Sequence, residues 1–218
     1  MSAGDVSVSQ SEHIKLSSDR VLFFISADTV EKNVHDRGFK DDIELKDTSK
    51  SDLTSSIYEG GLKVWEGSID LCNFVDSTTD EVVFINKSVL ENKSVIECFT
   101  KDNFILNNVK IDKCQFYAGD WADFKEFLGE RTFDIILSAE TIYNERMYER
   151  LHDLLDAALT PDGLVLLAAK LYYFGVGGSV PAFLDFVKSR GKFDSIISWT
   201  SKSEVPRQVI QLTRKASS

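Results

Sequence analysis

The chain has 218 residues, of which 43% are hydrophobic and 28% charged, with 12 glycines and 3 prolines. This balance fits one globular domain with its own core, and it excludes collagen-like, low-complexity and wholly disordered chains. The formal net charge of −10 excludes broad nucleic-acid binding, which depends on clustered Lys and Arg, so we expect a basic protein as the partner.

Targeting and metal signals are weak. The first five residues lack the basic and apolar regions of a secretory signal, and no apolar run approaches the length of a membrane span. We therefore expect a cytoplasmic or nuclear protein without membrane contact. Three Cys and three His stand far apart, which predicts neither a disulfide framework nor a metal site.

The N-terminal quarter shows little core pattern. Residues 1–19 are rich in Ser, Asp and Glu and predict a flexible leader, whereas Val21–Ile25 is the first plausible strand. Residues 26–56 are polar again, with little sign of a core face. We therefore expect a partly flexible extension over 1–56 and a folded domain over 57–218.

From about residue 84 onward, strand-like and helix-like segments alternate, which predicts an α/β fold with a largely parallel sheet. The clearest helix lies over 145–159, with Asn144 as its N-cap and Pro161-Asp162-Gly163 closing it off. The last two strands follow one another without a helix, which predicts an antiparallel hairpin. The strand candidates are 87–91, 114–117, 133–138, 163–171, 193–199 and 205–213.

Four short motifs follow one another: Tyr58-Glu59-Gly60-Gly61-Leu62-Lys63-Val64-Trp65-Glu66, Ala118-Gly119-Asp120-Trp121, Ser138-Ala139-Glu140-Thr141-Ile142-Tyr143-Asn144 and Lys170-Leu171-Tyr172-Tyr173-Phe174-Gly175-Val176-Gly177-Gly178. Together they resemble the protein-histidine methyltransferases that modify a histidine of a large-subunit ribosomal protein. The resemblance covers roughly residues 50–213. It implies the Rossmann-like sheet of class I methyltransferases with an antiparallel C-terminal hairpin, S-adenosyl-L-methionine as cofactor, and a basic ribosomal protein as substrate.

In the first motif, two glycines allow a tight turn that brings Trp65 near a pocket, although a core tryptophan on a hinged loop explains the same residues. The resemblance implies that Val64, Trp65, Glu66, Gly67 and Ser68 bind the cofactor.

In the second motif, Gly119, Asp120 and Trp121 follow a predicted strand, at the edge where open α/β sheets bind ligands. Asp120 would accept from an adenine amino group while Trp121 packs on the ring, so all three are cofactor-binding candidates. Asp120 fits equally well as the N-cap of a helix over 122–128.

The third motif ends a buried-strand pattern, where polar residues face the ligand crevice. The resemblance places it beside the transferable methyl group, with Ser138 as a cofactor contact and Glu140, Tyr143 and Asn144 as catalytic, substrate-side residues. Neutral imidazole is already nucleophilic near pH 7, so the enzyme has to select its tautomer rather than supply a strong base. Glu140 is the first candidate for that selection, whereas Asn144 also fits a simple helix cap.

The fourth motif combines three consecutive aromatic residues with three glycines. It predicts either a flexible loop that closes over a peptide substrate or a tight turn before a helix over 180–190. The first reading makes Tyr173, Phe174 and Gly175 substrate-binding candidates. A phosphate loop is excluded because the required Lys-Ser/Thr pair is absent.

One departure from the class I pattern stands out. These enzymes hold the cofactor with a glycine-rich loop after the first strand and an acidic residue at the end of the second. Here Asn86-Lys87-Ser88-Val89-Leu90-Glu91 runs straight into Asn92-Lys93-Ser94-Val95-Ile96-Glu97, and no glycine lies between Gly67 and Gly119. A strand–helix–strand unit needs about 30 residues. We therefore expect the chain to lack the glycine loop, the first crossover helix and the second strand, unless 81–85 substitutes for the strand, and to bind the cofactor poorly.

Three hypotheses account for this departure: a transcript or gene model with a skipped segment, a relative that binds partners without catalysis, or a complete enzyme that grips the cofactor in an unusual way. A related activity, protein-lysine methylation, is a further alternative, because sibling families share the tryptophan and Gly-Asp-Trp motifs.

Overall fold

The computed structural model describes residues 11–39, 64–78, 87–90 and 93–216. Their contacts divide the chain into two compact units. The first contains Met1–Val64 and Thr79–Gly119, and the second contains Trp65–Thr78 and Asp120–Ser218. The boundary predicted at residue 57 lies outside the described residues. No helix among these residues has the length and apolar character that crossing a membrane requires.

The first unit opens with an antiparallel hairpin of β1 (Ser11–Lys15) and β2 (Val21–Ile25), followed by α1 (Ala27–Asp36). Strand β2 was expected, but β1 and α1 correct the prediction of a flexible leader and a coreless stretch. Tertiary contacts hold β2, the strand on which β1 pairs. Asn103 accepts the backbone N–H of Ile25 at 2.8 Å, and Asn107 accepts that of Phe23 at 2.8 Å. These side chains satisfy the backbone of a short strand.

Helix α1 is held by a π-helical turn. The helical stretch comprises α3 (Lys93–Val95), the π turn η3 (Ile96–Thr100) and α4 (Lys101–Leu106). Asn33 on α1 donates to the carbonyl oxygen of Cys98 at 3.0 Å, and Arg37 pairs with the buried Asp102 at 2.7 Å. Such turns leave backbone carbonyls without their usual helical partners, and α1 supplies one of the donors.

Strands β3 (Lys87–Leu90) and β4 (Cys114–Tyr117) pair in parallel, and they are joined through α3, η3, α4 and the short turn η4 (Ile111–Lys113). These strands and the helix predicted between them are confirmed. Only Glu91 and Asn92 separate the end of β3 from the start of α3, and neither is a glycine. The segment 81–85, considered as a replacement strand, lies outside the described residues.

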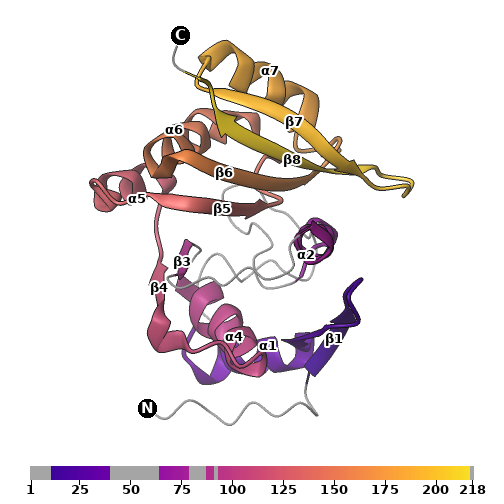
Figure 1. Ribbon diagram of the computed structural model, residues 1–218. Helices are drawn as coiled ribbons and strands as arrows, with labels where there is room; N and C mark the ends of the chain where they lie inside the picture. Colours follow the sequence, from indigo (N-terminus) through magenta and orange to yellow (C-terminus); the bar gives the residue numbers. More distant parts are fainter. Residues whose placement is uncertain (1–10, 40–63, 79–86, 91–92, 217–218) are drawn as a thin grey trace. The chain divides into compact units, whose positions relative to one another are not determined.

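The second unit is built on a four-stranded sheet in the order β5-β6-β8-β7 (Figure 1). Strand β5 runs parallel to β6, whereas β8 is antiparallel to both β6 and β7. The predicted α/β fold with an antiparallel C-terminal hairpin is therefore confirmed. The sheet is mixed because β8, a member of that hairpin, lies between β7 and β6 and is antiparallel to both. The strands are β5 (Phe133–Ala139), β6 (Leu159–Lys170), β7 (Phe193–Thr200) and β8 (Arg207–Arg214).

Helices cover both faces of this sheet (Figure 1). On one face, α2 (Glu66–Thr78) packs Leu71 against β6 and β8. The larger core on the other face includes Phe183 and Leu167 and is covered by α6 and α7. The other helices of this second unit are α5 (Trp121–Leu128), the short turn η5 (Glu145–Met147), α6 (Tyr148–Ala158) and α7 (Val180–Arg190).

The predicted terminator of the 145–159 helix is wrong. Pro161, Asp162 and Gly163 all lie within β6, which begins directly at Leu159. Arg214 instead marks the end of α6. Its guanidinium pairs with Asp156 at 2.6 Å and donates to the carbonyl oxygen of Leu159 at 2.7 Å. A cation at the end of a helix satisfies its last carbonyls.

Candidate functional site

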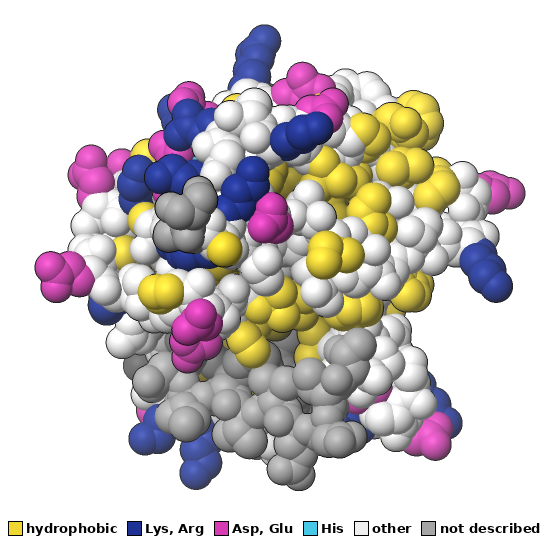
Figure 2. Space-filling model, turned by 45° about the horizontal axis from the view of Figure 1, so that its top comes forward, with side chains coloured by type: hydrophobic (Ala, Val, Ile, Leu, Met, Phe, Trp, Pro, Cys, Tyr) yellow, Lys and Arg dark blue, Asp and Glu magenta, His cyan; other side chains and the backbone are white. Residues whose placement is uncertain are grey.

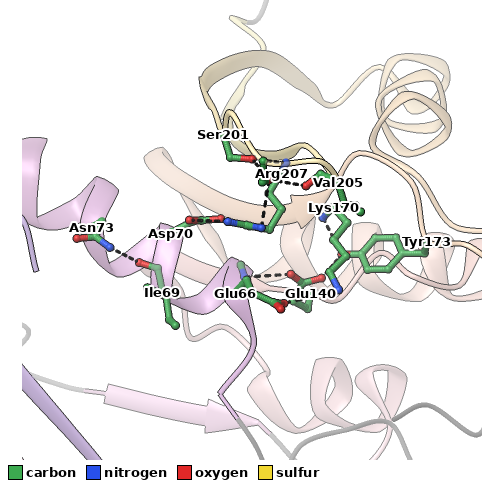
Figure 3. A network of polar contacts seen from close by, with 12 residues as sticks. Glu66, Ile69, Asp70, Asn73, Glu140, Lys170, Tyr173, Ser201, Val205 and Arg207 are labelled. Carbon is green, nitrogen blue, oxygen red and sulfur yellow. Dashed lines mark hydrogen bonds and ion pairs between the residues drawn. The ribbon is translucent and has the colours of Figure 1, made fainter. Parts of the chain in front are cut away.

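Glu140 lies directly after β5, in a backbone conformation that non-glycine residues seldom adopt. Its φ is 58°, within the left-handed region. Its backbone N–H donates to the carbonyl oxygen of Ala168 on β6 at 2.8 Å, which continues the pairing of the two strands by one residue. The strained conformation aims the side chain toward the start of α2 (Figure 3).

Both carboxylate oxygens of Glu140 accept a hydrogen bond. Oε1 accepts the backbone N–H of Gly67 at 3.1 Å, and Oε2 accepts the hydroxyl of Tyr173 at 2.5 Å (Figure 3). A Cβ at position 67 would lie 2.3 Å from Oε1, so any larger residue there would displace the Glu140 carboxylate from this position. Gly67, which directly follows the first motif, therefore meets the third motif (Glu140) and the fourth motif (Tyr173) at this carboxylate.

Burial sets the electrostatics of this contact. Loss of solvent raises the pKa of Glu140, and the hydrogen bond from Tyr173 and the charge of Lys170 oppose that rise. Burial and the neighbouring carboxylate also raise the pKa of Tyr173 far above its usual range, so this hydroxyl stays protonated as a donor.

Charged residues continue the network along α2. The Nζ of Lys170 lies 3.6 Å from Oε2 of Glu66 and 5.1 Å from the centre of the Trp65 ring. One helical turn further, Asp70 accepts two hydrogen bonds from the Arg207 guanidinium on β8 (Figure 3). The hydrogen bond and charge of Asp70 raise the pKa of Arg207, so its guanidinium stays charged.

The fourth-motif loop is fixed at its base. The backbone N–H of Tyr173 donates to the carbonyl oxygen of Gly178 at 2.9 Å, and Gly178 donates to Tyr143 at 2.8 Å. The loop lines a shallow cavity of about 500 Å³ formed by residues 172–179. These contacts bond the base of the loop to the third motif, and closure of the loop over a peptide stays a prediction. Phe174 nevertheless remains 82% exposed at its tip.

Several predicted site residues come together in this unit. Trp65, Glu66, Gly67, Glu140 and Tyr173 share the network just described. The Tyr143 ring packs edge-on against Tyr173, with 6.3 Å between ring centres. Ser138 bonds Thr141, with 2.6 Å between the hydroxyl oxygens. Ser68 lies in the first turn of α2, and its backbone N–H donates to the carbonyl oxygen of Trp65.

Other candidates have structural contacts instead. Asp120 caps α5 by accepting the N–H of Ala122 at 2.8 Å and also pairs with Arg150. Asn144 caps η5 by accepting the N–H of Arg146 at 3.1 Å. These contacts confirm the capping interpretation of both residues, and their proposed roles toward a ligand stay predictions.

The remaining cofactor candidates and the substrate candidate Gly175 differ in position. Trp121 opens α5 and packs against the larger core. Val64 and Gly119 belong to the first unit, where Val64 packs against Ile25, Val30 and Phe99. The exposed Gly175 lies in the loop that lines the cavity.

Three charged residues of the network were not predicted. Lys170 is the first residue of the fourth motif, two positions before the aromatic run, which was a usable signal. Asp70 and Arg207 are 137 positions apart and belong to no motif, so only the packing of α2 on β8 reveals them.

The described residues fit only part of an S-adenosyl-L-methionine site. Class I sites use backbone N–H groups of a glycine turn and an acidic residue for the ribose. In this structure β3 passes to α3 through two non-glycine residues, and the Asp120 carboxylate is already engaged by a cap and an ion pair.

Comparisons with known proteins place these features in a family. A model of the lysine methyltransferase family matches residues 89–173. Histidine protein methyltransferase 1 homologues from Dictyostelium discoideum and Rattus norvegicus are 30% and 32% identical to this chain, over 76% and 78% of its length. The chain spans about three fifths of the length of these relatives, 62% and 61% respectively.

A solved structure of a precorrin-6y C5,15-methyltransferase from Geobacter metallireducens covers 60% of this chain and 68% of its own chain, with 15% identity and a TM-score of 0.43. These values are too low to bear on function, so the family assignment depends on the sequence relatives.

Proposed function

Because this chain belongs to the family of the histidine protein methyltransferases, we propose that its function is S-adenosyl-L-methionine-dependent methylation of a histidine in a basic protein, with cofactor binding weakened in this chain. The observation that carries the proposal is the Glu140 carboxylate, held at the end of β5 between the start of α2 and the fourth-motif loop.

Methyl transfer to a histidine mainly requires the protein to align the cofactor's methyl group with the attacking imidazole nitrogen. The cofactor supplies an electrophilic methyl group, and a neutral imidazole nitrogen attacks it in line. An imidazole presents one lone pair only when its other nitrogen carries the proton. Each oxygen of Glu140 keeps a lone pair after the bonds from Gly67 and Tyr173, so the carboxylate has room to accept the N–H of a substrate histidine.

The substrate side of the proposal rests on charge and exposure. A net charge of −10 favours a basic partner, and we propose a large-subunit ribosomal protein. Phe174 and Tyr172, which are 82% and 49% exposed, offer aromatic surface for the peptide beside the cavity. Tyr143 and Asn144 lie in the same third motif and complete the proposed substrate side.

Two observations support weakened cofactor binding. The first is the direct passage from β3 to α3 without a glycine turn. The second is the alignment with the rat relative, which extends over 224 positions although this whole chain has 218 residues. The relative therefore carries residues inside the aligned span that have no counterpart here. Both fit the loss of a strand–helix–strand unit.

Two alternatives have support of their own. The first is a non-catalytic protein that binds the same partner. Such a protein would keep the aromatic loop but would not need the nucleotide clamp, meaning the glycine-rich loop and the acidic residue that hold the cofactor, and the short β3–α3 junction supports this alternative. The family model that matches residues 89–173 is described as lysine methyltransferase, which supports methylation of a lysine instead.

Mass spectrometry decides among these functions. The chain is incubated with S-adenosyl-L-methionine and a basic ribosomal protein that contains both histidine and lysine, and the modified residue is located by fragmentation. Methyl-histidine that is lost in the Glu140→Gln variant supports the proposal. Methyl-lysine favours the second alternative, and capture of the partner without any methyl transfer favours the first.

A further inference from the structure

We infer that Tyr173 is a positioning residue, whose hydroxyl acts with the Gly67 N–H to hold the Glu140 carboxylate in one orientation toward the substrate imidazole. This inference rests on the proposed function for what the carboxylate does, but its physical content concerns three residues of this chain. It gives Tyr173 a different task from the substrate contact that the sequence suggests.

The Tyr173 hydroxyl has little freedom to serve another acceptor. Its oxygen accepts the backbone N–H of Lys170 at 3.2 Å, and its own proton goes to Oε2 of Glu140 at 2.5 Å. The side chain is buried, at 8% exposure, and its ring packs edge-on against Tyr143. A hydroxyl fixed on both sides in this way is a dedicated donor to the carboxylate.

The second contact comes from backbone, which makes the orientation more specific. The N–H of Gly67 reaches Oε1 at 3.1 Å, and the absence of a Cβ there lets the carboxylate approach within van der Waals distance of the helix start. The two donors bind different oxygens, so together they fix the plane of the carboxylate. Such surroundings also explain how Glu140 keeps a left-handed backbone conformation that is otherwise costly.

Ionisation gives the Tyr173 contact a second consequence. Burial favours the protonated form of Glu140 and raises its pKa, and a protonated carboxyl would be a poorer acceptor for an imidazole N–H. The hydrogen bond from Tyr173 is the largest contribution that lowers the pKa again, ahead of Lys170 and Gly67. The Tyr173 hydroxyl therefore favours the ionised, accepting form of the Glu140 carboxylate.

The neighbours of Tyr173 are available for the peptide instead. Tyr172 and Phe174 flank it in the sequence and are exposed, whereas Tyr173 points inward to the carboxylate (Figure 3). Within the aromatic run, the buried Tyr173 therefore orients Glu140, whereas the exposed Phe174 is proposed to contact substrate.

The test follows the Glu140 carboxyl directly, by NMR titration of the full chain labelled with 13C at glutamate carboxyl carbons. Glu140→Gln identifies the resonance. In Tyr173→Phe, which keeps the ring and removes only the hydroxyl, we expect the pKa of Glu140 to rise. In Tyr172→Phe, the matched control at an exposed hydroxyl, it should stay as in the wild type. An unchanged Glu140 titration in Tyr173→Phe overturns the inference.

A second variant guards against a merely unfolded protein. Gly67→Ala pushes a methyl group into Oε1 and removes no titratable group. It should perturb the Glu140 resonance in the same direction, while resonances of the N-terminal unit keep their folded positions. If the Glu140 resonance does not change in Gly67→Ala, the joint positioning of its carboxylate by Gly67 and Tyr173 is contradicted.

Turnover distinguishes failure of this inference from failure of the proposed function. Where methyl-histidine forms, Tyr173→Phe should lower kcat roughly 100-fold with little change in KM, and the acid limb of the pH profile should move to higher pH. A shifted Glu140 titration without any histidine methylation leaves the positioning role standing and removes the proposed function. Unchanged kcat and pH profile in Tyr173→Phe remove the positioning role and leave the function.

Discussion

The buried hydroxyl of Tyr148 accepts the backbone N–H of Ser179 at 2.9 Å and lies 3.2 Å from the carbonyl oxygen of Ile142. One side chain at the start of α6 thereby joins the third motif to the end of the fourth-motif loop. Because these backbone groups are buried, their hydrogen bonds cannot be replaced by water without opening the loop.

Tyr148→Phe should therefore lower the free energy of unfolding by about 1–3 kcal/mol, the usual cost of leaving a buried polar group without its partner. Urea denaturation followed by circular dichroism measures the change. Tyr172→Phe, at a 49% exposed side chain, serves as the control and should stay close to the wild type. Equal stability of the Tyr148 and Tyr172 variants would show that the Tyr148 hydroxyl does not hold the loop.

Gly178 carries a steric constraint that a second glycine of the same loop does not share. A Cβ at position 178 would lie 2.1 Å from the carbonyl oxygen of Ile142, whereas one at Gly175 meets no atom within 4 Å. Gly178→Ala should cost about 3 kcal/mol of stability, as overpacking against fixed backbone does. Gly175→Ala should cost only the roughly 1–2 kcal/mol of a left-handed alanine, given its φ of 80°. Thermal denaturation compares them, and the reverse ranking would contradict the close approach.

The ion pair of Asp70 and Arg207 should stabilise α2 on the sheet. Its side chains are only 13% and 19% exposed, and a lysine cannot reproduce the two-point contact. Arg207→Lys should lower the opening free energy of α2 amides by about 1–3 kcal/mol, measured by hydrogen exchange. Glu149→Gln, which breaks the more exposed pair with Arg190, should change it by less than about 1 kcal/mol. Equal protection of α2 in the two variants would count against this role.

His152 should make the stability of the second unit depend on pH. It is 1% exposed, and neither ring nitrogen hydrogen-bonds another residue that the structure describes. Burial and the nearby Arg190 lower its pKa, with Asp153 and Asp156 opposing the change. The unfolded chain therefore binds a proton at a higher pH than the folded chain. The contribution is complete above the unfolded pKa of about 6.5 and is lost as pH falls toward the folded value.

His152→Leu should flatten that part of the stability profile, while His35→Gln, at an exposed histidine, should leave it unchanged. Urea midpoints measured at intervals below pH 7 give the comparison. A steep acid slope that persists in His152→Leu would assign the slope to other groups.

The sequence predicted the limits of those helices and strands whose ends are set by residues within or next to the element. Helix α7 has the predicted limits because Ser179 caps its start, and Gly191, in the left-handed conformation, ends it. Strand β4 also matches its prediction residue for residue. By contrast, β1 depends on its pairing with β2, whose backbone bonds Asn103 and Asn107, and α1 depends on its contacts with the π turn. Strand β6 runs through Pro161 because Arg214, from the far end of the chain, ends the preceding helix.

The candidate site shows the same difference between what local sequence predicts and what only tertiary packing reveals. The third and fourth motifs drew attention to Glu140 and Tyr173 separately, since polar and aromatic clusters at strand ends favour function. Their contact across 33 positions, and the Gly67 N–H that completes it, arise from packing of α2 and the loop against β5 and β6. No local pattern encodes such a meeting of three segments.

Calorimetric titration with S-adenosyl-L-methionine tests the central claim most directly: that a histidine methyltransferase homologue keeps its substrate-side carboxylate but lacks the nucleotide clamp. The account predicts a dissociation constant of about 1 mM or weaker for this chain, near −4 kcal/mol. Insertion of the relatives' segment of about 30 residues between Glu91 and Asn92 should tighten it to the micromolar range. Micromolar binding by the chain as it stands would contradict the account.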